Sequence, residues 1–160
     1  MNPFLSQAIL LAEKNVKEGG RPFGAVVVKD QQVIATGVNR MQAECDPTAH
    51  AELLALREAG KALKSPRLDG CQVYASGQPC PMCLAAMRMS GVTEIVFAYS
   101  NEQAEPFGLS TAAIARELSA PVEQQNWAVI THQPDPAAVE AEQHLYHQWQ
   151  ATDSLPDTQP

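Results

Sequence analysis

The sequence predicts an α/β fold: a three-layer α/β/α sandwich around a central mixed sheet of five strands. Two observations carry this prediction: a hairpin of two β-branched runs opens the sheet, and helical and strand patterns alternate after it. The chain has 160 residues and no internal repeat, which fits a single domain. We expect residues 1–150 to form this domain and residues 151–160 to form a flexible tail.

The first helix is expected to begin after Asn2, which can cap it, with Pro3 at its opening position. Gly19 and Gly20 are expected to end it. Its apolar face would be formed by Phe4, Leu5, Ala8, Ile9, Ala12 and Val16.

The hairpin is predicted in residues 24–39, where two β-branched runs meet around Asp30. Residues 46–63 have helical periodicity, and Asp46 or Thr48 is the expected cap. The later elements, in order, are a strand at 71–76, a helix at 81–90, a strand at 93–100, a polar loop at 101–110, a helix at 111–118, a strand at 126–130 and a last helix at 136–150.

The net charge is −7, from 11 basic and 18 acidic side chains, and no Lys or Arg follows Arg116. Proteins that bind nucleic acids gain much of their affinity from Lys and Arg, so the charge disfavours a polynucleotide partner and favours small uncharged substrates. No stretch approaches the roughly 20 apolar residues of a membrane span. The first 20 residues carry no basic leader, so we expect a cytoplasmic protein, in which Cys residues are more often ligands or catalysts than disulfides.

Cys80 and Cys83 are three residues apart, around Pro81. Three chemistries use this spacing: a redox disulfide, a structural zinc knuckle, and an open zinc site with bound water. The two cysteines lie at the cap and in the first turn of a predicted helix, where the helix dipole favours thiolate. Which chemistry applies depends on the other residues that reach the same point.

His50 and Glu52 lie in the first turn of another predicted helix. Helical side chains lean toward the helix N-terminus, so the two helix starts can present His50, Cys80 and Cys83 to one metal ion. Three protein ligands leave the fourth zinc position open, which is typical of catalytic zinc. Glu52 is then placed to take a proton from the bound water.

The other histidines and cysteines leave alternatives open. A thioredoxin-type redox pair needs only Cys80 and Cys83, and a structural Cys₄ zinc would add Cys45 and Cys71. A third alternative is a metal site at His144 and His147, although such an i, i+3 pair on a polar helix more often faces solvent.

Residues 50–52 (HAE) and 79–83 (PCPMC) match the zinc nucleobase-deaminase signature H-x-E…P-C-x-x-C. From the first helix to about Ile130, the chain resembles the cytidine-deaminase-like superfamily. This resemblance implies one Zn²⁺ per chain, bound by His50, Cys80 and Cys83, with Glu52 as the proton carrier of a hydrolytic deamination that releases ammonia.

Two branches of the superfamily share motifs like these, the guanine-deaminase-like branch and the tRNA adenosine deaminases. Residues 19–30 (GGRPFGAVVVKD) resemble the first branch, since the second tends to carry Val at the position of Phe23. Asn39 matches a family position that hydrogen-bonds the base, and the backbone N–H of Ala51 would meet a ring carbonyl oxygen. Phe23 offers a face for stacking. The simpler alternatives are a core residue for Phe23 and a turn residue for Asn39.

The chain also departs from the guanine deaminase pattern. Gln78 replaces a common Glu, and the sequence ends in Asp-Thr-Gln-Pro where those enzymes place a closing aromatic residue. Met89 and Leu109 are apolar at positions near which those enzymes use an aromatic residue and an acid. Tyr146 and Trp149 are the candidates for a lid in this chain.

The sequence thus predicts a zinc-dependent hydrolytic deaminase of purine metabolism that acts on a free nucleobase or related amino-heterocycle, with guanine as the first candidate. The alternatives are a tRNA adenosine deaminase, a deaminase of cytosine, isocytosine or a nucleoside, and a non-catalytic zinc-stabilised binding module. The resemblance also implies a homodimer, since family members are commonly dimers and some exchange C-terminal segments.

Overall fold

The computed structural model describes residues 1–139 and 144–152, which divide into two compact units. The first unit, Met1–Arg116, contains the sheet and the sequence motifs, and the second begins at Glu117. The prediction that residues 1–150 form one domain stays a prediction. Most of the expected tail, 151–160, lies outside the described residues.

The sheet is mixed, as predicted, and in the described residues it has four strands. They are β1 (Gly24–Lys29), β2 (Gln32–Val38), β3 (Cys71–Gly77) and β4 (Glu94–Tyr99), in the order β2-β1-β3-β4. β1 is antiparallel to both of its neighbours, and β3 is parallel to β4. The predicted hairpin is confirmed: Asp30 and Gln31 connect β1 to β2 with φ values of 50° and 63°, a pair of left-handed residues that suits a two-residue hairpin loop.

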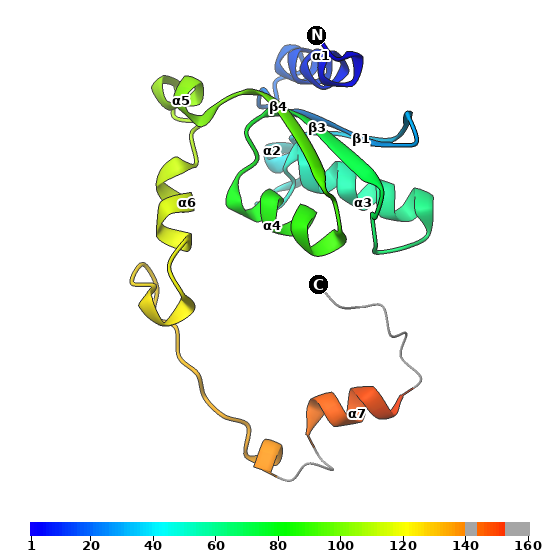
Figure 1. The fold of residues 1–160 in the computed structure, drawn as a ribbon. Coiled ribbons are helices and arrows are strands. Elements are labelled where there is room, and N and C mark those ends of the chain that lie inside the picture. The colour runs from blue at the N-terminus through cyan, green and yellow to red at the C-terminus, as the bar shows by residue number, and fades with distance from the viewer. Residues whose placement is uncertain (140–143, 153–160) are drawn as a thin grey trace. The chain divides into compact units, whose positions relative to one another are not determined.

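Helices cover both faces of this sheet, which confirms the three-layer sandwich (Figure 1). The helix α1 (Pro3–Lys17) packs on one face, and α3 (Ala51–Leu63) and α4 (Pro81–Ser90) lie on the other. Alternate residues of β1 feed the two cores: Val26 and Val28 pack with α1, and Val27 packs with the cluster of α3 and α4. β1 is therefore buried on both faces, along nearly its whole length.

The expected ends of the first helix are confirmed. The Asn2 Oδ1 atom accepts hydrogen bonds from the N–H groups of Phe4 (2.8 Å) and Leu5 (3.2 Å). At the other end, Gly19 adopts a φ of 90°, a left-handed conformation that costs glycine little and stops the helix.

The expected cap of the next long helix was wrong. The N-cap of α3 is His50, and Asp46 instead accepts hydrogen bonds from the N–H (2.8 Å) and hydroxyl (2.7 Å) of Thr48. Asp46 therefore closes a turn before the helix, a role for which aspartate competes with capping. His50 is left with its ring free of a capping bond, at the very end of α3.

The fifth strand, predicted at 126–130, is absent from the described residues, where this stretch has no regular structure. Trp127 is 59% exposed and Val129 is 97% exposed. An apolar run becomes a strand only when another strand pairs with it and a core covers one face, and these residues have neither within their own unit.

The remaining segments are short helices. They are α2 (Met41–Glu44), α5 (Asn101–Ala104), η1 (Glu105–Phe107), α6 (Ala112–Leu118), η2 (Val122–Gln124), η3 (Pro136–Val139) and α7 (Leu145–Ala151). The last predicted helix, 136–150, thus appears as η3 and α7, and 140–143 between them lie outside the described residues. None of the helices in the described ranges combines the length and the apolar character that crossing a bilayer requires.

Close contact between β2 and α3 places the start of α3. A Cβ atom added to Gly37 would lie 2.8 Å from the backbone N of Ala55 and closer still to the carbonyl oxygen of Ala51. Only glycine lets the strand approach the first turn of α3 this closely.

We therefore expect Gly37→Ala to lower the free energy of unfolding by about 1–3 kcal/mol, because the helix backbone must move to admit a methyl group. Urea unfolding measures this loss. Val33→Ala on the same strand, at a site 39% exposed, is the control and should cost less than Gly37→Ala. An equal or smaller loss for Gly37→Ala would show that the contact is not tight.

Candidate metal centre and base-binding site

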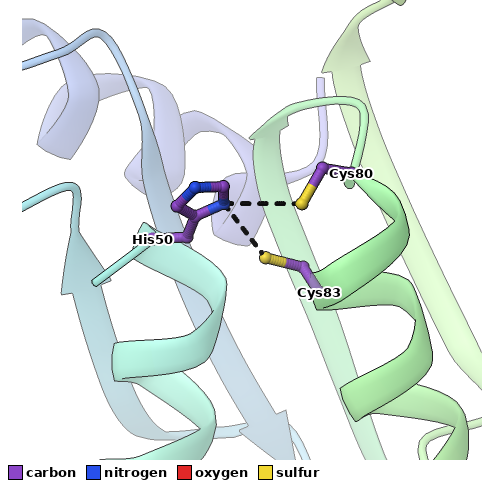
Figure 2. A group of neighbouring side chains, drawn as sticks. All are labelled: His50, Cys80 and Cys83. Carbon is purple, nitrogen blue, oxygen red and sulfur yellow. Dashed lines mark hydrogen bonds between the residues drawn. The ribbon is translucent and has the colours of Figure 1, made fainter. Parts of the chain in front are cut away.

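Three metal-ligating side chains meet at the N-terminal ends of two helices (Figure 2). His50 is the N-cap of α3, Cys80 is the N-cap of α4, and Cys83 lies in the first turn of α4. Pro81 at the first position of α4 has no N–H to be satisfied and fixes a helical φ, so the helix starts directly behind Cys80. Side chains at helix starts lean away from the helix body, and here both helices send them to one point.

The spacing of the three ligand atoms fits zinc. The His50 Nδ1 atom lies 3.4 Å from the Cys80 Sγ atom and 3.5 Å from the Cys83 Sγ atom. Dashed lines join these atoms in Figure 2. A tetrahedral zinc with ordinary Zn–N and Zn–S bonds separates such atoms by about 3.6 Å. All three atoms lie within 4.8 Å of one another, so one ion can contact all of them.

A hydrogen bond couples the two thiols. A hydrogen bond from Cys83 lowers the pKa of Cys80 to about 4, and the same hydrogen bond raises the pKa of Cys83. The hydrogen bond with Cys80 also raises the pKa of His50. Loss of a proton from Cys80 is thus favoured, and a divalent cation would displace the remaining proton of the pair on binding.

Glu52 lies in the first turn of α3 and is only 7% exposed. Burial raises the pKa of its carboxyl, and the neighbouring Cys80 sulfur acts in the same direction. A buried carboxyl beside a metal-ligand group is typical of a site that moves protons.

Asn39 follows the end of β2 and is 6% exposed. Its Oδ1 atom accepts a hydrogen bond from the N–H of Met41 at 3.2 Å, so the amide presents its NH₂ group as the donor for any other partner. Ala51 is the first residue of α3, where a backbone N–H has no acceptor inside the helix.

Phe23 is half-buried and packs against the core cluster that contains Cys80 and Cys83. Its ring lies beside the end of β3, since a Cβ atom on Gly77 would be 3.1 Å from it. The same ring lines a cavity of about 600 Å³. The structure therefore places Phe23 against the core and on the wall of this cavity, whose lining residues do not include His50, Cys80 or Cys83.

The positions that depart from the guanine deaminase pattern are spread over the unit. Leu109 lines the same cavity as Phe23, and Met89 is 53% exposed on α4. The Gln78 side-chain oxygen accepts the N–H of Asn101 at 2.9 Å, which ties the loop before Cys80 to the start of α5. The lid candidates Tyr146 and Trp149 belong to the second unit.

The remaining cysteines and histidines take no part in the group. In the described ranges, the cluster of ligand atoms comprises His50, Cys80 and Cys83, while Cys45 is exposed and Cys71 is buried at the start of β3. The ring of His144 caps α7 by accepting the N–H of Tyr146.

One residue near the site was missed by the sequence analysis. Asn15 is a buried polar residue on α1, and its side chain contacts the backbone of Asn39. The sequence signal that could have identified Asn15 was its position on the apolar face of the helix, three residues after Ala12.

Comparisons with known proteins agree with this geometry. Residues 2–99 match the family model of the cytidine and deoxycytidylate deaminase zinc-binding region. A guanine deaminase of Bacillus subtilis (strain 168) is 42% identical over 123 residues, which cover 76% of this chain and 79% of that protein. A tRNA-specific adenosine deaminase of Aquifex aeolicus (strain VF5) is 37% identical over 94 residues, 59% of this chain and 62% of that protein.

Among solved structures, the X-ray structure of guanine deaminase from Bacillus subtilis superposes with a TM-score of 0.86 and 34% identity, over 99% of both chains. This match extends the likeness from the zinc-binding region to nearly the whole chain. The chain therefore belongs to the zinc-binding family of cytidine and deoxycytidylate deaminases and is a hydrolytic deaminase, an enzyme that acts on C–N bonds.

Proposed function

We propose that this deaminase acts on a free nucleobase, with guanine as the substrate and xanthine and ammonia as the products. The observation that carries the proposal is the meeting of His50, Cys80 and Cys83 beside the buried Glu52. Two similar structures, 31% and 30% identical, were solved in complex with 2,6-diaminopurine and with 8-azaguanine. These ligands support a purine base as the substrate class.

His50, Cys80 and Cys83 would hold the zinc, and the convergence of their ligand atoms supports this assignment. Bound there, zinc lowers the pKa of a water molecule and so supplies a nucleophile near neutral pH. The N-termini of α3 and α4 point at the same place, and their dipoles favour negative charge there.

Glu52 would carry the protons of the reaction. It would take a proton from the attacking water and deliver it to a ring nitrogen as the C–O bond forms. It would then pass the remaining hydroxyl proton to the amino group, which leaves as ammonia when the C–N bond breaks. Its burial supports this role, because a carboxyl shielded from bulk water keeps the proton within the site.

Asn39, Ala51 and Phe23 would bind the base. The NH₂ group of Asn39 and the backbone N–H of Ala51 supply donors for ring nitrogen or carbonyl acceptors. The ring of Phe23, which is half-exposed, supplies a stacking face. A polar base is discriminated strongly by such donors, since a wrong base leaves them unpaired.

A tRNA adenosine deaminase is the second candidate, because tRNA-specific relatives are 37% to 41% identical over about 60% of this chain. The net charge of −7 favours the free base, since an RNA partner requires clustered cations.

We also place the enzyme in the cytoplasm, because its cysteines are used as ligands rather than as disulfides, which is typical of that compartment.

We also propose a homodimer. β4 is an edge strand of the described sheet, and its Phe97 and Tyr99 side chains are 41% and 55% exposed. An apolar sheet edge of this kind is covered in most native proteins. Sedimentation equilibrium should give twice the chain mass, and a monomer at every concentration would contradict the proposal.

We expect the purified protein to hold one zinc ion per chain and Cys83→Ser to hold much less than one. The thiolate is a far stronger zinc ligand than a hydroxyl group, so its loss opens the site. Elemental analysis measures the content. Cys45→Ser is the matched control, because Cys45 is exposed and away from the ligand group, and it should keep its zinc. Full zinc content in Cys83→Ser would remove Cys83 from the ligand set.

We expect the wild-type enzyme to release ammonia from guanine, and Glu52→Gln to lower kcat by about 10²–10⁴-fold while zinc stays bound. The amide keeps the shape of the side chain and cannot carry the proton. The same ammonia-release assay is run on adenine, cytosine, isocytosine, their nucleosides and a tRNA anticodon stem-loop. Release from the stem-loop alone would favour the tRNA candidate. Unchanged turnover in Glu52→Gln would leave the zinc without its proposed proton carrier.

A further inference from the structure

We propose that Asn15 is a positioning residue for base recognition: it holds the peptide of Asn39 so that the Asn39 amide faces the substrate. The inference rests on the proposed function, in which Asn39 binds the base. Asn15 itself lies on α1, outside the two sequence motifs.

Asn15 joins three segments of the chain. It is 7% exposed, and its Nδ2 atom donates to the carbonyl oxygens of Arg21 at 2.7 Å and Asn39 at 3.0 Å. Both hydrogens of the amide are thereby used. The helix α1, the segment leading to Phe23 and the end of β2 are thus connected through one side chain.

The hydrogen bond from Asn15 to Asn39 matters because it holds the peptide unit between Asn39 and Arg40. The carbonyl of Asn39 and the N–H of Arg40 belong to one planar unit. Asn15 binds the carbonyl end, and the N–H end donates to the carbonyl oxygen of Ala49 at 2.9 Å. Ala49 directly precedes His50, so this peptide is fixed on one side to α1 and on the other to the segment that carries the metal ligand.

The Asn39 side chain departs from the Cα atom next to this pinned peptide. The N–H of Asn39 also donates to the carbonyl oxygen of Phe23 at 3.2 Å. Together these bonds set the direction of the side chain relative to His50, and the bond from Met41 then sets the rotation of its amide.

The surroundings of Asn15 are shaped for its amide. A Cβ atom on Gly20 would lie 2.5 Å from the Asn15 Nδ2 atom, so Gly20 leaves the space that the amide occupies. Asparagine is a weak helix former, and burying its amide on an apolar helix face costs free energy unless every donor is paired. An apolar residue would suit this face better if packing against the sheet were its only role.

The test is the kinetics of Asn15→Ala with guanine, in a double-mutant cycle with Asn39→Ala. Loss of the pinning bond should raise KM about tenfold, the factor that corresponds to about 1.4 kcal/mol. kcat should stay within about twofold and zinc content should be unchanged, because this bond serves base binding rather than the chemical step. In the Asn39→Ala background, the same change should leave KM nearly unaltered.

Leu5→Ala is the matched structural control. Leu5 is buried on the same helix, in the cluster on the α1 face, so this variant lowers stability and should leave KM unchanged. Hydrogen exchange at the Arg40 amide should become faster in Asn15→Ala and stay unchanged in Leu5→Ala. If Asn15→Ala does not fold, Asn15→Ser, which keeps a shorter donor, replaces it in every arm.

The outcomes distinguish a failure of the positioning role of Asn15 from a failure of the proposed function. If Asn39→Ala raises KM and Asn15→Ala does not, the positioning role is overturned and the proposed function stands. If Asn15→Ala raises KM by the same factor in both backgrounds, Asn15 does not act through Asn39, and the inference fails. If Asn39→Ala leaves KM unchanged, or the wild-type enzyme does not turn over guanine, the proposed function fails and the inference falls with it.

Discussion

The rest of the site depends on one constraint, the convergence of the N-termini of α3 and α4 on one face of the sheet. This convergence brings the His50 Nδ1 atom within 3.5 Å of two cysteine sulfurs that are 30 and 33 residues away along the chain. It also directs two helix dipoles at the same point, which favours thiolate there. Glu52 needs no separate support, because the helix that presents His50 carries it in its first turn.

The sheet supplies the rigidity that this convergence requires. β1 is buried on both faces, so α3 and α1 are fixed relative to each other through its alternate side chains. Glycine at position 37 lets α3 sit directly on β2. The proposed base-binding residues lie next to these same strands: Phe23 directly precedes β1, and Asn39 directly follows β2. The candidate metal centre and the proposed base-binding residues thus lie at adjoining ends of one scaffold.

Much of this could be predicted from the sequence, because the relevant signals are local. The Asn2 cap, the hairpin turn and the start of α4 at Pro81 each depend on residues within one turn, and all are confirmed. The fifth strand failed because an apolar run such as 126–130 needs a partner strand that the run does not encode. Asn15 was missed for a similar reason, since its role depends on hydrogen bonds to the carbonyl groups of Arg21 and Asn39, which lie outside its own helix.

The central claim is that the cysteine pair belongs to an open zinc site with three protein ligands. X-ray absorption at the zinc edge of the purified enzyme tests it most directly. The account predicts two sulfur atoms at about 2.3 Å, with one histidine nitrogen and one further light atom at about 2.0 Å. Four sulfur atoms, or two histidines with no sulfur, would contradict the ligand set and the chemistry built on it.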